Sequence, residues 1–552
     1  MKALFQKWTA SRPGSQHVSV RNTDTSRDGE CQTLLHITKS SDRCSLSPGE
    51  RVRVRAGVNS DSPLFQFAAR TFAGVFLLAL AGCAVGPNYH RPAALPAQPV
   101  PQQFSETTPT NADMAVWKIA EPSADVPRGE WWKLFNDPEL NRLESLAATN
   151  NQNLAAAAAR LEQARYMLTA ARADFYPQLN AGGTPNGDIN RQRTSVNQPV
   201  AGKTSGVSHT YNTFTAPLYM GWEIDLWGRV RRQSQAAKAR YVATADDLES
   251  ARLAIAAEVA DDYFTLRTLD NEYGLITNTI DAYTRSLELT QNRRQGGIVS
   301  DLDVSQAATQ LHSAEAELPD VELQRVQTVH ALAIVCGQAP VDFPLSTNPP
   351  DFTVPIVPPS LPSELLERRP DIAAAERRMS AANADIGVAT AAFFPTVRIN
   401  GLAGFQSISA SSWFDWPSRF WSVGPSIQLP LFTGGLNTAN LKIARAAYDE
   451  AVADYRQVVL DAFGEVQDQL AAQRLLTNKA TAENQAVTSA QRTLAIATNR
   501  YRAGLVTYLD VATAQADALS HERIAVELQG SRLNATINLI RALGSGWQTA
   551  QK

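Results

Sequence analysis

Few residues in this sequence have the types and spacing that enzymatic chemistry needs. Cys31, Cys44 and Cys336 lack the spacing of metal ligands, and the seven histidines do not cluster with them. Glu223 and Asp225 come nearest to a catalytic carboxylate pair, but their two-residue spacing puts both on the polar face of a strand, where they would face water. No glycine-rich phosphate loop or Ser/His/Asp arrangement stands out. The sequence therefore predicts no enzyme, no metal and no cofactor.

One cysteine does lie in a chemical context of its own. Arg70 precedes an apolar run that stops at Cys83; the run is too short for a permanent membrane span but fits the core of a signal peptide. The last four residues of this stretch, Leu-Ala-Gly-Cys, resemble the bacterial lipobox, in which cleavage precedes the cysteine. The alternative is an ordinary small-residue cleavage site at which a cysteine happens to fall. We predict a lipoprotein signal peptide over residues 66–82, with S-diacylglycerol and N-palmitoyl groups on Cys83.

The residues before this signal are unexpected, because a secretory signal peptide begins near the initiator methionine. About 65 polar residues without hydrophobic periodicity come first. We interpret residues 1–65 as a non-native or disordered extension that arose from a misassigned start codon, with Val54, Val58 or Leu64 as candidate true starts. Peptide mapping of the precursor tests this interpretation.

The composition favours elongated helices over a wide core. Of the 552 residues, 44% are apolar but only 8% aromatic. Alanine dominates the helical stretches, and its small side chain lets helices approach closely. The net charge of −3 leaves no basic surface of the kind that binds nucleic acid.

The chain contains an internal repeat with an offset of 207 residues. The matched pairs around two helix turns are Gly297 with Gly504, Leu302 with Leu509, Asp303 with Asp510 and Val304 with Val511. The match extends back to Gly228 and Gly435. A repeat of this length indicates a duplicated structural unit.

Proline-rich segments delimit the two copies. Residues 83–130 read as a lipid-anchored, extended tether, and residues 340–362 carry eight prolines in 23 residues and read as a linker. The copies are then residues 131–339 and 363–545. The first opens with Asp137 and a proline placed to start a helix, followed by one or two helices over 139–174.

The hydrophobic period changes from 3.6 to 2 after each aromatic-proline stop, at Pro177 and Pro395. One hairpin is expected at about 177–227 and another at about 395–432, and the Gly/Asn/Ser-rich segment 181–210 fits an exposed loop. Apolar and polar residues alternate along these strands, except at Leu402. Strands of about ten residues with one apolar face suit a membrane-spanning β-barrel.

Four strands per chain cannot close a barrel, and an open edge would leave backbone groups unpaired in lipid. Several chains must therefore share one barrel. The alternative is a soluble four-stranded sheet whose apolar face is covered by helices.

Each hairpin is followed by a very long helix. Residues 229–295 are free of proline and span roughly 100 Å at 1.5 Å per residue. Apolar side chains recur there at heptad spacing, which predicts coiled-coil packing; the two series are Val259, Leu266, Tyr273, Ile280 and Leu287, and Leu269, Ile276 and Tyr283. Gly297 and Gly504 would end the long helices, and antiparallel helices would return over 300–334 and 507–543.

Taken together, the lipobox, the Gly-Pro-Asn-Tyr-x-Arg-Pro segment at residues 86–92, the two helix–hairpin–helix copies and the paired Gly-x-x-x-x-Leu-Asp-Val turns resemble the outer membrane factors of bacterial tripartite efflux pumps. The resemblance covers about residues 83–545 and is to the lipoprotein branch of the TolC-like channels. It implies an α+β fold and a homotrimer, in which a 12-stranded transmembrane β-barrel with four strands per chain continues into a long periplasmic α-helical barrel.

The resemblance also implies partners and a role. A periplasmic adaptor protein and an inner-membrane transporter, commonly of the resistance-nodulation-division (RND) type, would feed the channel. The chain would be a passive exit duct for drugs, metals or other toxic solutes, in the outer membrane of a Gram-negative bacterium.

Site residues follow from the same resemblance. The adaptor-docking turns match Gly297, Ile298, Gly504 and Leu505, and the periplasmic gate matches Asp303, Tyr501 and Asp510. Two positions depart from the family pattern: Val506 stands where some members have a gate arginine, and Thr513 where some have a second aspartate. Leu509 or Asp510 would then form the constriction instead.

The two aspartates also have a local explanation. Ser300 with Asp303, and Thr507 with Asp510, have capping-box spacing, and a carboxylate in the first turn is stabilised by the helix dipole by about 0.3–1 kcal/mol. Capping and gating can coexist. Two functional alternatives remain open from sequence: the exit duct of a type I protein-secretion system, and a non-conducting periplasmic coiled-coil scaffold lipoprotein.

Overall fold

The computed structural model describes residues 84–95, 129–183, 188–194, 207–341, 343–345, 355 and 368–544. The predicted extension at 1–65, the signal peptide at 66–82 and Cys83 lie outside the described residues, as does most of the linker at 340–362. All described residues belong to one compact unit, residues 72–552.

The first repeat is a succession of helices interrupted by strands. Its helices are η1 (Trp131–Phe135), α2 (Pro138–Asn150), α3 (Gln152–Ala173), α4 (Arg229–Gln295) and α5 (Asp301–Val335). Asp137 caps α2 as predicted, because its Oδ1 accepts from the backbone nitrogens of Glu139 at 2.8 Å and Leu140 at 3.2 Å. The predicted 67-residue helix is confirmed by α4, which has the same bounds.

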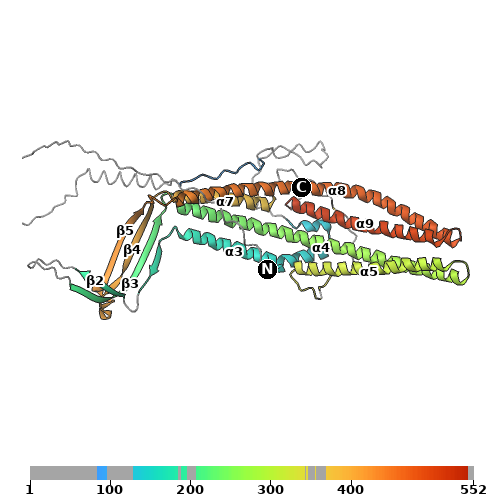
Figure 1. Ribbon diagram of the computed structural model, residues 1–552, viewed down its shortest axis with the longest axis horizontal. Helices are drawn as coiled ribbons and strands as arrows, with labels where there is room; N and C mark the ends of the chain where they lie inside the picture. The colour runs from blue at the N-terminus through green and yellow to red at the C-terminus, as the bar shows by residue number, and fades with distance from the viewer. Residues whose placement is uncertain are drawn as a thin grey trace, which may run out of the picture. The chain divides into compact units, whose positions relative to one another are not determined.

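The second repeat copies these helices in length. Its helices are α7 (Pro370–Ala391), α8 (Leu436–Arg502) and α9 (Tyr508–Ala542). They have 22, 67 and 35 residues, as do α3, α4 and α5. Figure 1 shows α4 and α8 running away from the strands, with α5 and α9 returning beside them. None of the described helices combines the length and apolar character needed to cross a membrane.

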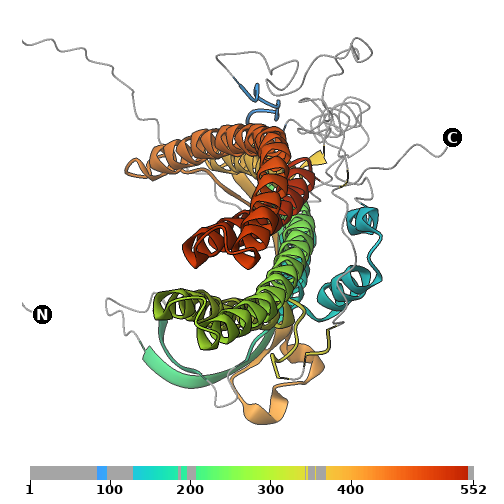
Figure 2. The ribbon, with the colours of Figure 1, turned by 90° about the vertical axis from the view of Figure 1, so that its right-hand side faces the viewer.

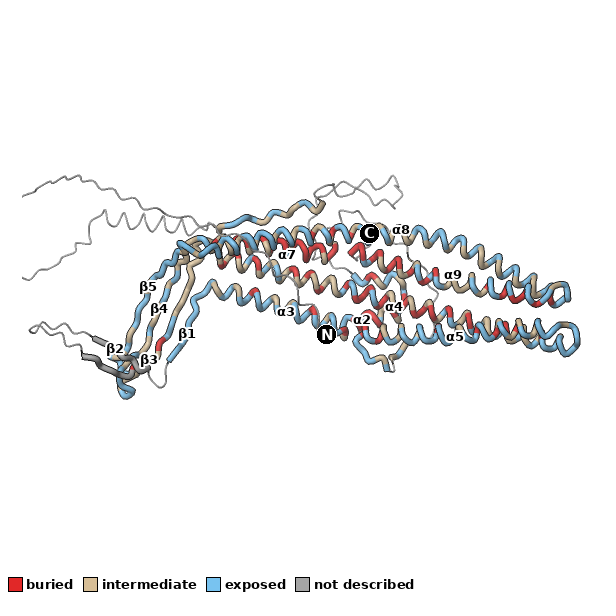
Figure 3. Tube along the Cα trace, in the orientation of Figure 1, coloured by how far each residue is buried: buried red, intermediate tan, exposed pale blue. Residues whose placement is uncertain are grey.

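The helices pack side by side as a single curved layer, which Figure 2 shows end-on. In this layer α4 contacts α3 and α5 on one side and α7 and α9 on the other, while α8 packs on α7 and α9. The margins of the layer are therefore α8 at one side and α3 with α5 at the other. Figure 3 shows the consequence: burial concentrates in α4, α7 and α9, whereas only five of the 67 residues of α8 are buried.

The strands form one antiparallel sheet. It contains β1 (Gln178–Ala181), β2 (Asp188–Thr194), β3 (Val207–Ile224), β4 (Thr396–Ser407) and β5 (Arg419–Gln428). Both β1 and β2 pair with β3, which pairs with β4, which pairs with β5. Ala181 pairs with Leu218 and Asp188 pairs with Thr213, so six residues separate the paired ends of β1 and β2 where β3 has four. Since β1 and β2 share one position, the described residues supply four strand positions, as predicted.

The register of the sheet gathers apolar residues on one face. Consecutive rows across β3, β4 and β5 are Leu218–Ala403–Trp421, Met220–Gly401–Val423, Trp222–Ile399–Pro425 and Ile224–Val397–Ile427. Neighbouring positions carry the other face, which includes Tyr219, Glu223, Arg398, Asn400 and Gln428. Leu402, which interrupts the alternation in the sequence, lies opposite Tyr219 and so belongs to the polar side. Several apolar side chains stay exposed, such as Trp421 at 74% and Ile427 at 71%.

The main core lies where α2, α4 and α9 meet. Its buried members include Leu140, Tyr263, Phe264 and Ile540 from these helices, together with Trp131 of η1 and Leu332 of α5. One predicted core position is wrong: Tyr273 is 36% exposed, and the neighbouring Glu272 is buried instead. Glu272 accepts from Nε of Arg523 on α9 at 2.9 Å, so a charged contact replaces the expected apolar one.

The segment 84–95 lies fixed against the helices. Val85 donates its backbone N–H to the carbonyl of Trp227 at 2.9 Å. Further along, Arg232 of α4 donates to Asn88 at 3.1 Å, and Arg91 donates to the hydroxyl of Tyr455 at 3.0 Å. The chain just after Cys83 is thus held beside the junction of β3 and α4.

Candidate functional site: the helix turns of the two repeats

The two helix turns have the same backbone geometry. We call residues 292–306 and 499–513 the tip. Gly297 and Gly504 adopt φ values of 71° and 74°, which favour glycine. Ile298 donates its N–H to the carbonyl of Arg293, and Leu505 donates to the carbonyl of Arg500, each at 2.9 Å. These bonds close the last turn of each long helix in a Schellman-like motif.

Apolar side chains project from both turns. Ile298 is 66% exposed and Leu505 is 69% exposed, although both are large and hydrophobic. Leu302 and Leu509, in the first turns of the returning helices, are 66% and 57% exposed. Water-facing side chains of this size at matched positions mark a surface that can be covered by another molecule.

Asp303 is a capping residue and also a bridge between the repeats. Its Oδ2 accepts from the backbone nitrogen of Ser300 at 2.9 Å and from the hydroxyl at 2.7 Å, and its Oδ1 accepts from the backbone nitrogen of Tyr508 at 3.3 Å. Partial burial would raise the pKa of Asp303, but these donors outweigh it and lower the pKa below its ordinary value. The carboxylate therefore ties the start of α5 to the start of α9.

Asp510 caps α9 only. Its Oδ2 accepts from the backbone nitrogen of Thr507 at 3.2 Å and from the hydroxyl at 3.1 Å. The capping boxes predicted for Asp303 and Asp510 are both confirmed. Asp510 differs from Asp303 in being exposed.

Tyr501 lies inside the tip. It is 3% exposed, and its ring meets that of Tyr508 edge-on at 5.4 Å between centroids. Ala307, Val511 and Ala512 complete this small core, which joins side chains of both repeats. The Tyr501 hydroxyl has no hydrogen-bond partner, whereas that of Tyr508 donates to Gln515 at 3.2 Å. Tyr501 thus acts through packing in this conformation.

Sequence reasoning missed Arg293. Its Nη1 donates to the carbonyls of Tyr501 at 2.9 Å and Arg502 at 3.2 Å, at the end of α8. Its guanidinium carbon also lies 4.8 Å from the centroid of the Tyr501 ring. The signal for this role in the sequence is weak: a basic residue in the last turn of α4 can complement a helix C-terminus. Only the tertiary structure, in which the end of α4 meets the end of α8 at the tip, shows that the C-terminus it complements belongs to the other repeat.

The two positions that depart from the family pattern carry no charge into the tip. Val506 is half-buried and packs against the Tyr501 cluster. Thr513 is exposed, and its hydroxyl donates to the carbonyl of Leu509 at 3.0 Å. The charged contacts described for the tip come from Arg293, from the capping carboxylates Asp303 and Asp510, and from the pair of Arg294 with Asp301 at 2.7 Å.

The carboxylate pair noted in the sequence is engaged in ion pairs. Glu223 contacts Arg229 at 2.7 Å and Arg398 at 3.2 Å, and Asp225 contacts Arg231 at 3.2 Å. In the part of the chain that the structure describes, no group of three His, Cys, Asp or Glu side chains could hold a metal ion. The contacts at these residues are those of structural ion pairs.

Each repeat contains a β-hairpin with one apolar face, followed by two long antiparallel helices. This arrangement defines the class of protein: a subunit of a channel that has a strand section and a helical section. The sequence matches the family model described as outer membrane efflux protein over residues 143–338 and 361–545. Outer membrane protein OprJ of Pseudomonas aeruginosa is 35% identical over 473 residues, which are 85% of this chain and 94% of OprJ.

Two further comparisons agree. The "Probable outer membrane lipoprotein SilC" of Salmonella typhimurium is 31% identical over 489 residues, 88% of this chain and 100% of SilC. The solved outer-membrane channel OprN has a TM-score of 0.73 at 30% identity and covers 84% of this chain and 100% of its own. The chain belongs to the outer membrane efflux protein family. The protein is a non-enzymatic outer-membrane channel of an efflux pump. It has the TolC-like fold, and its helices extend into the periplasm.

Proposed function

We propose that three copies of this chain form one conduit, which receives small toxic solutes from a periplasmic adaptor and an inner-membrane transporter of the RND type. The observation that carries this proposal is the sheet. Its β1/β2 position and β5 each pair on one side only among the described strands, and one face is apolar throughout the rows given above. Pairing the β5 edge of one copy with the β1/β2 edge of the next would satisfy both edges and close a 12-stranded barrel.

The margins of the helical layer support the same assembly. Along α8, Ile443, Leu460, Leu475 and Ile496 are 50–66% exposed. On α3, at the opposite margin, Tyr166 and Met167 are 66% and 67% exposed. A second copy would cover these apolar side chains with its own opposite margin, at a gain of about 25 cal/mol per Å² buried.

Lipidation of Cys83 fits the same placement. Only Ala84 separates Cys83 from Val85, which is hydrogen-bonded to Trp227 at the end of the sheet. Beyond β5, Leu431 and Phe432 are 89% and 92% exposed. A lipid on Cys83 would therefore join apolar side chains at the strand–helix junction, where the bilayer surface would lie.

We assign the gate to Asp303, Tyr501, Leu509 and Asp510. Leu509 and Asp510 are exposed beside the turn, so three copies around an axis could present an apolar ring and an acidic ring. Asp303 and Tyr501 are largely covered and would act as braces that hold the two turns together.

The adaptor would dock on Gly297, Ile298, Gly504 and Leu505. Ile298 and Leu505 are exposed apolar side chains at matched positions, so each chain offers two copies of one small surface. A bulky side chain at either glycine would strain the positive φ and disturb that surface.

Export of small solutes is favoured over protein secretion, because the relatives are described as efflux components and outer-membrane proteins. The decisive experiment combines mass and conductance. Purified mature protein should have the mass of a trimer and give single-channel currents in planar bilayers, and deletion of the gene should sensitise the strain to small toxic compounds. A monomer without currents would refute the assembly; intact currents with a secretion defect and unchanged drug susceptibility would assign the channel to secretion.

A further inference from the structure

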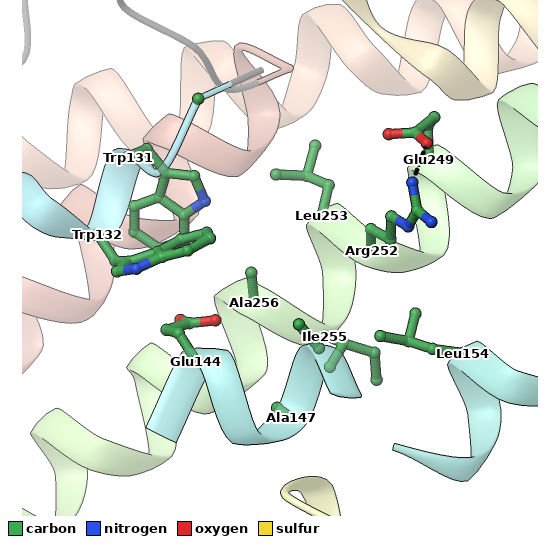
Figure 4. A pocket seen from close by; sticks show the side chains of 12 residues that line it. Trp131, Trp132, Glu144, Ala147, Leu154, Glu249, Arg252, Leu253, Ile255 and Ala256 are labelled. Carbon is green, nitrogen blue, oxygen red and sulfur yellow. Dashed lines mark hydrogen bonds and ion pairs between the residues drawn. The ribbon is translucent and has the colours of Figure 1, made fainter. Parts of the chain in front are cut away.

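A pocket lies outside the tip, between α2 and α4. It has a volume of about 260 Å³ and is lined on one side by Trp131 and Trp132 of η1. Across from them lie apolar residues of α4, including Leu253, Ile255 and Ala256. Figure 4 shows the carboxylate of Glu144 from α2 facing the same space as Trp132 and Ala256.

Glu144 is the anomaly of this pocket. The residue is 3% exposed, and its Oε1 has no hydrogen-bond partner. Burial alone raises the pKa of Glu144 to about 9, since no charged group contributes. The other carboxylate at the pocket, Glu249, is instead paired with Arg252 at 2.6 Å and more exposed. A buried carboxyl without compensation destabilises the fold, so a binding role would explain its position.

We propose that this pocket binds a small amphiphilic amine, with its ammonium on Glu144 and its apolar body against the two indoles. Trp is the aromatic side chain that attracts cations best, and a carboxylate at the end of an aromatic pocket gives an ammonium a charge-assisted hydrogen bond. An inorganic cation is a poor match, because apolar walls cannot replace its hydration shell.

The size of the pocket limits the ligand. A cavity of about 150 Å³ holds benzene, so the pocket has room for one aromatic ring and a short aminoalkyl arm. 2-Phenylethylamine is therefore a suitable probe. Its uncharged analogue 2-phenylethanol has nearly the same shape and serves as the matched ligand control.

Titration calorimetry with the purified mature protein tests the proposal. Wild type should bind 2-phenylethylamine, and Glu144→Gln should weaken binding about 10-fold to 100-fold while keeping the fold, because the amide is nearly isosteric. Glu249→Gln is the control at the same pocket and should bind as wild type does. Since the empty pocket holds a protonated carboxyl at pH 7, binding should release a proton, seen by comparing buffers of different ionisation enthalpy.

A second variant separates the pocket from Glu144 itself. Trp132→Leu removes one indole from a half-buried position and should also weaken binding of the amine. The proposal is overturned if Glu144→Gln binds the amine as wild type does, if 2-phenylethanol binds equally well, or if wild type binds neither compound. Channel conductance is not the readout, so failure here leaves the assembly proposed above untouched.

Discussion

Replacement of Arg293 tests whether the two turns of the tip are locked together. Its guanidinium donates twice to carbonyls at the end of α8 and lies over the Tyr501 ring. Hydrogen bonds that involve a charged group contribute about 1.5–3 kcal/mol each, and a cation–π contact about 0.5–1 kcal/mol at an exposed site. These contacts share one half-buried guanidinium, so their energies are not additive. We therefore take about 2 kcal/mol per chain as the stabilisation that Arg293 gives to the contact between the two turns.

A loss of about 2 kcal/mol corresponds to a roughly 30-fold shift in an equilibrium. If the closed tip depends on this lock, Arg293→Ala should raise the open probability of single channels in planar bilayers by about that factor per chain. Arg293→Lys should lie between, since lysine keeps the charge but loses the planar fork.

The neighbouring Arg294 provides the matched control. It pairs with Asp301 of its own turn, at 2.7 and 3.0 Å, and reaches no residue of the other repeat through these bonds. Arg294→Ala should therefore leave the open probability near the wild-type value. Equal opening by both variants, or no opening by Arg293→Ala in a correctly folded trimer, would refute the lock.

Three further predictions concern other parts of the chain. Asp510→Asn should change conductance or block by cations in planar bilayers, because it would remove three charges from a ring; lost stability with unaltered conductance would leave capping as its sole role. Glu144→Gln should raise the thermal midpoint more at pH 8 than at pH 5. The pKa of Glu144 is raised from 4.5 to about 9, so between these pH values the wild-type carboxyl keeps its proton in the folded state and loses it in the unfolded state. Its contribution to stability therefore falls as the pH rises from 4.5 to about 9. A midpoint difference that does not grow with pH would contradict this. Cys83→Ser should abolish incorporation of labelled palmitate, whereas Cys336→Ser should not, because Cys336 is buried; labelling of the Cys83 variant would contradict the lipobox interpretation.

Local patterns in the sequence were sufficient for much of the fold. The two-residue alternation around Val397 and Ile399 predicted which residues share a face, because a strand alternates its side chains whatever it packs against. Gly297 likewise predicted the end of one helix, and Asp303 predicted the start of the next. Glycine at positive φ and a capping carboxylate both act within one turn of the backbone. The duplication allowed each of these predictions to be checked against the second repeat of the sequence.

Tertiary structure decided what depends on contacts between distant segments. Tyr273 occupies a heptad position but faces outward, and the neighbouring Glu272 contacts Arg523 of α9 instead. The reach of Arg293 to the end of α8 and the burial of Glu144 depend on which helices lie side by side. Periodicity along one helix fixes the direction of a side chain but not the partner it meets. That partner determines whether a charged group caps a helix, links the two repeats or stays buried without a hydrogen bond.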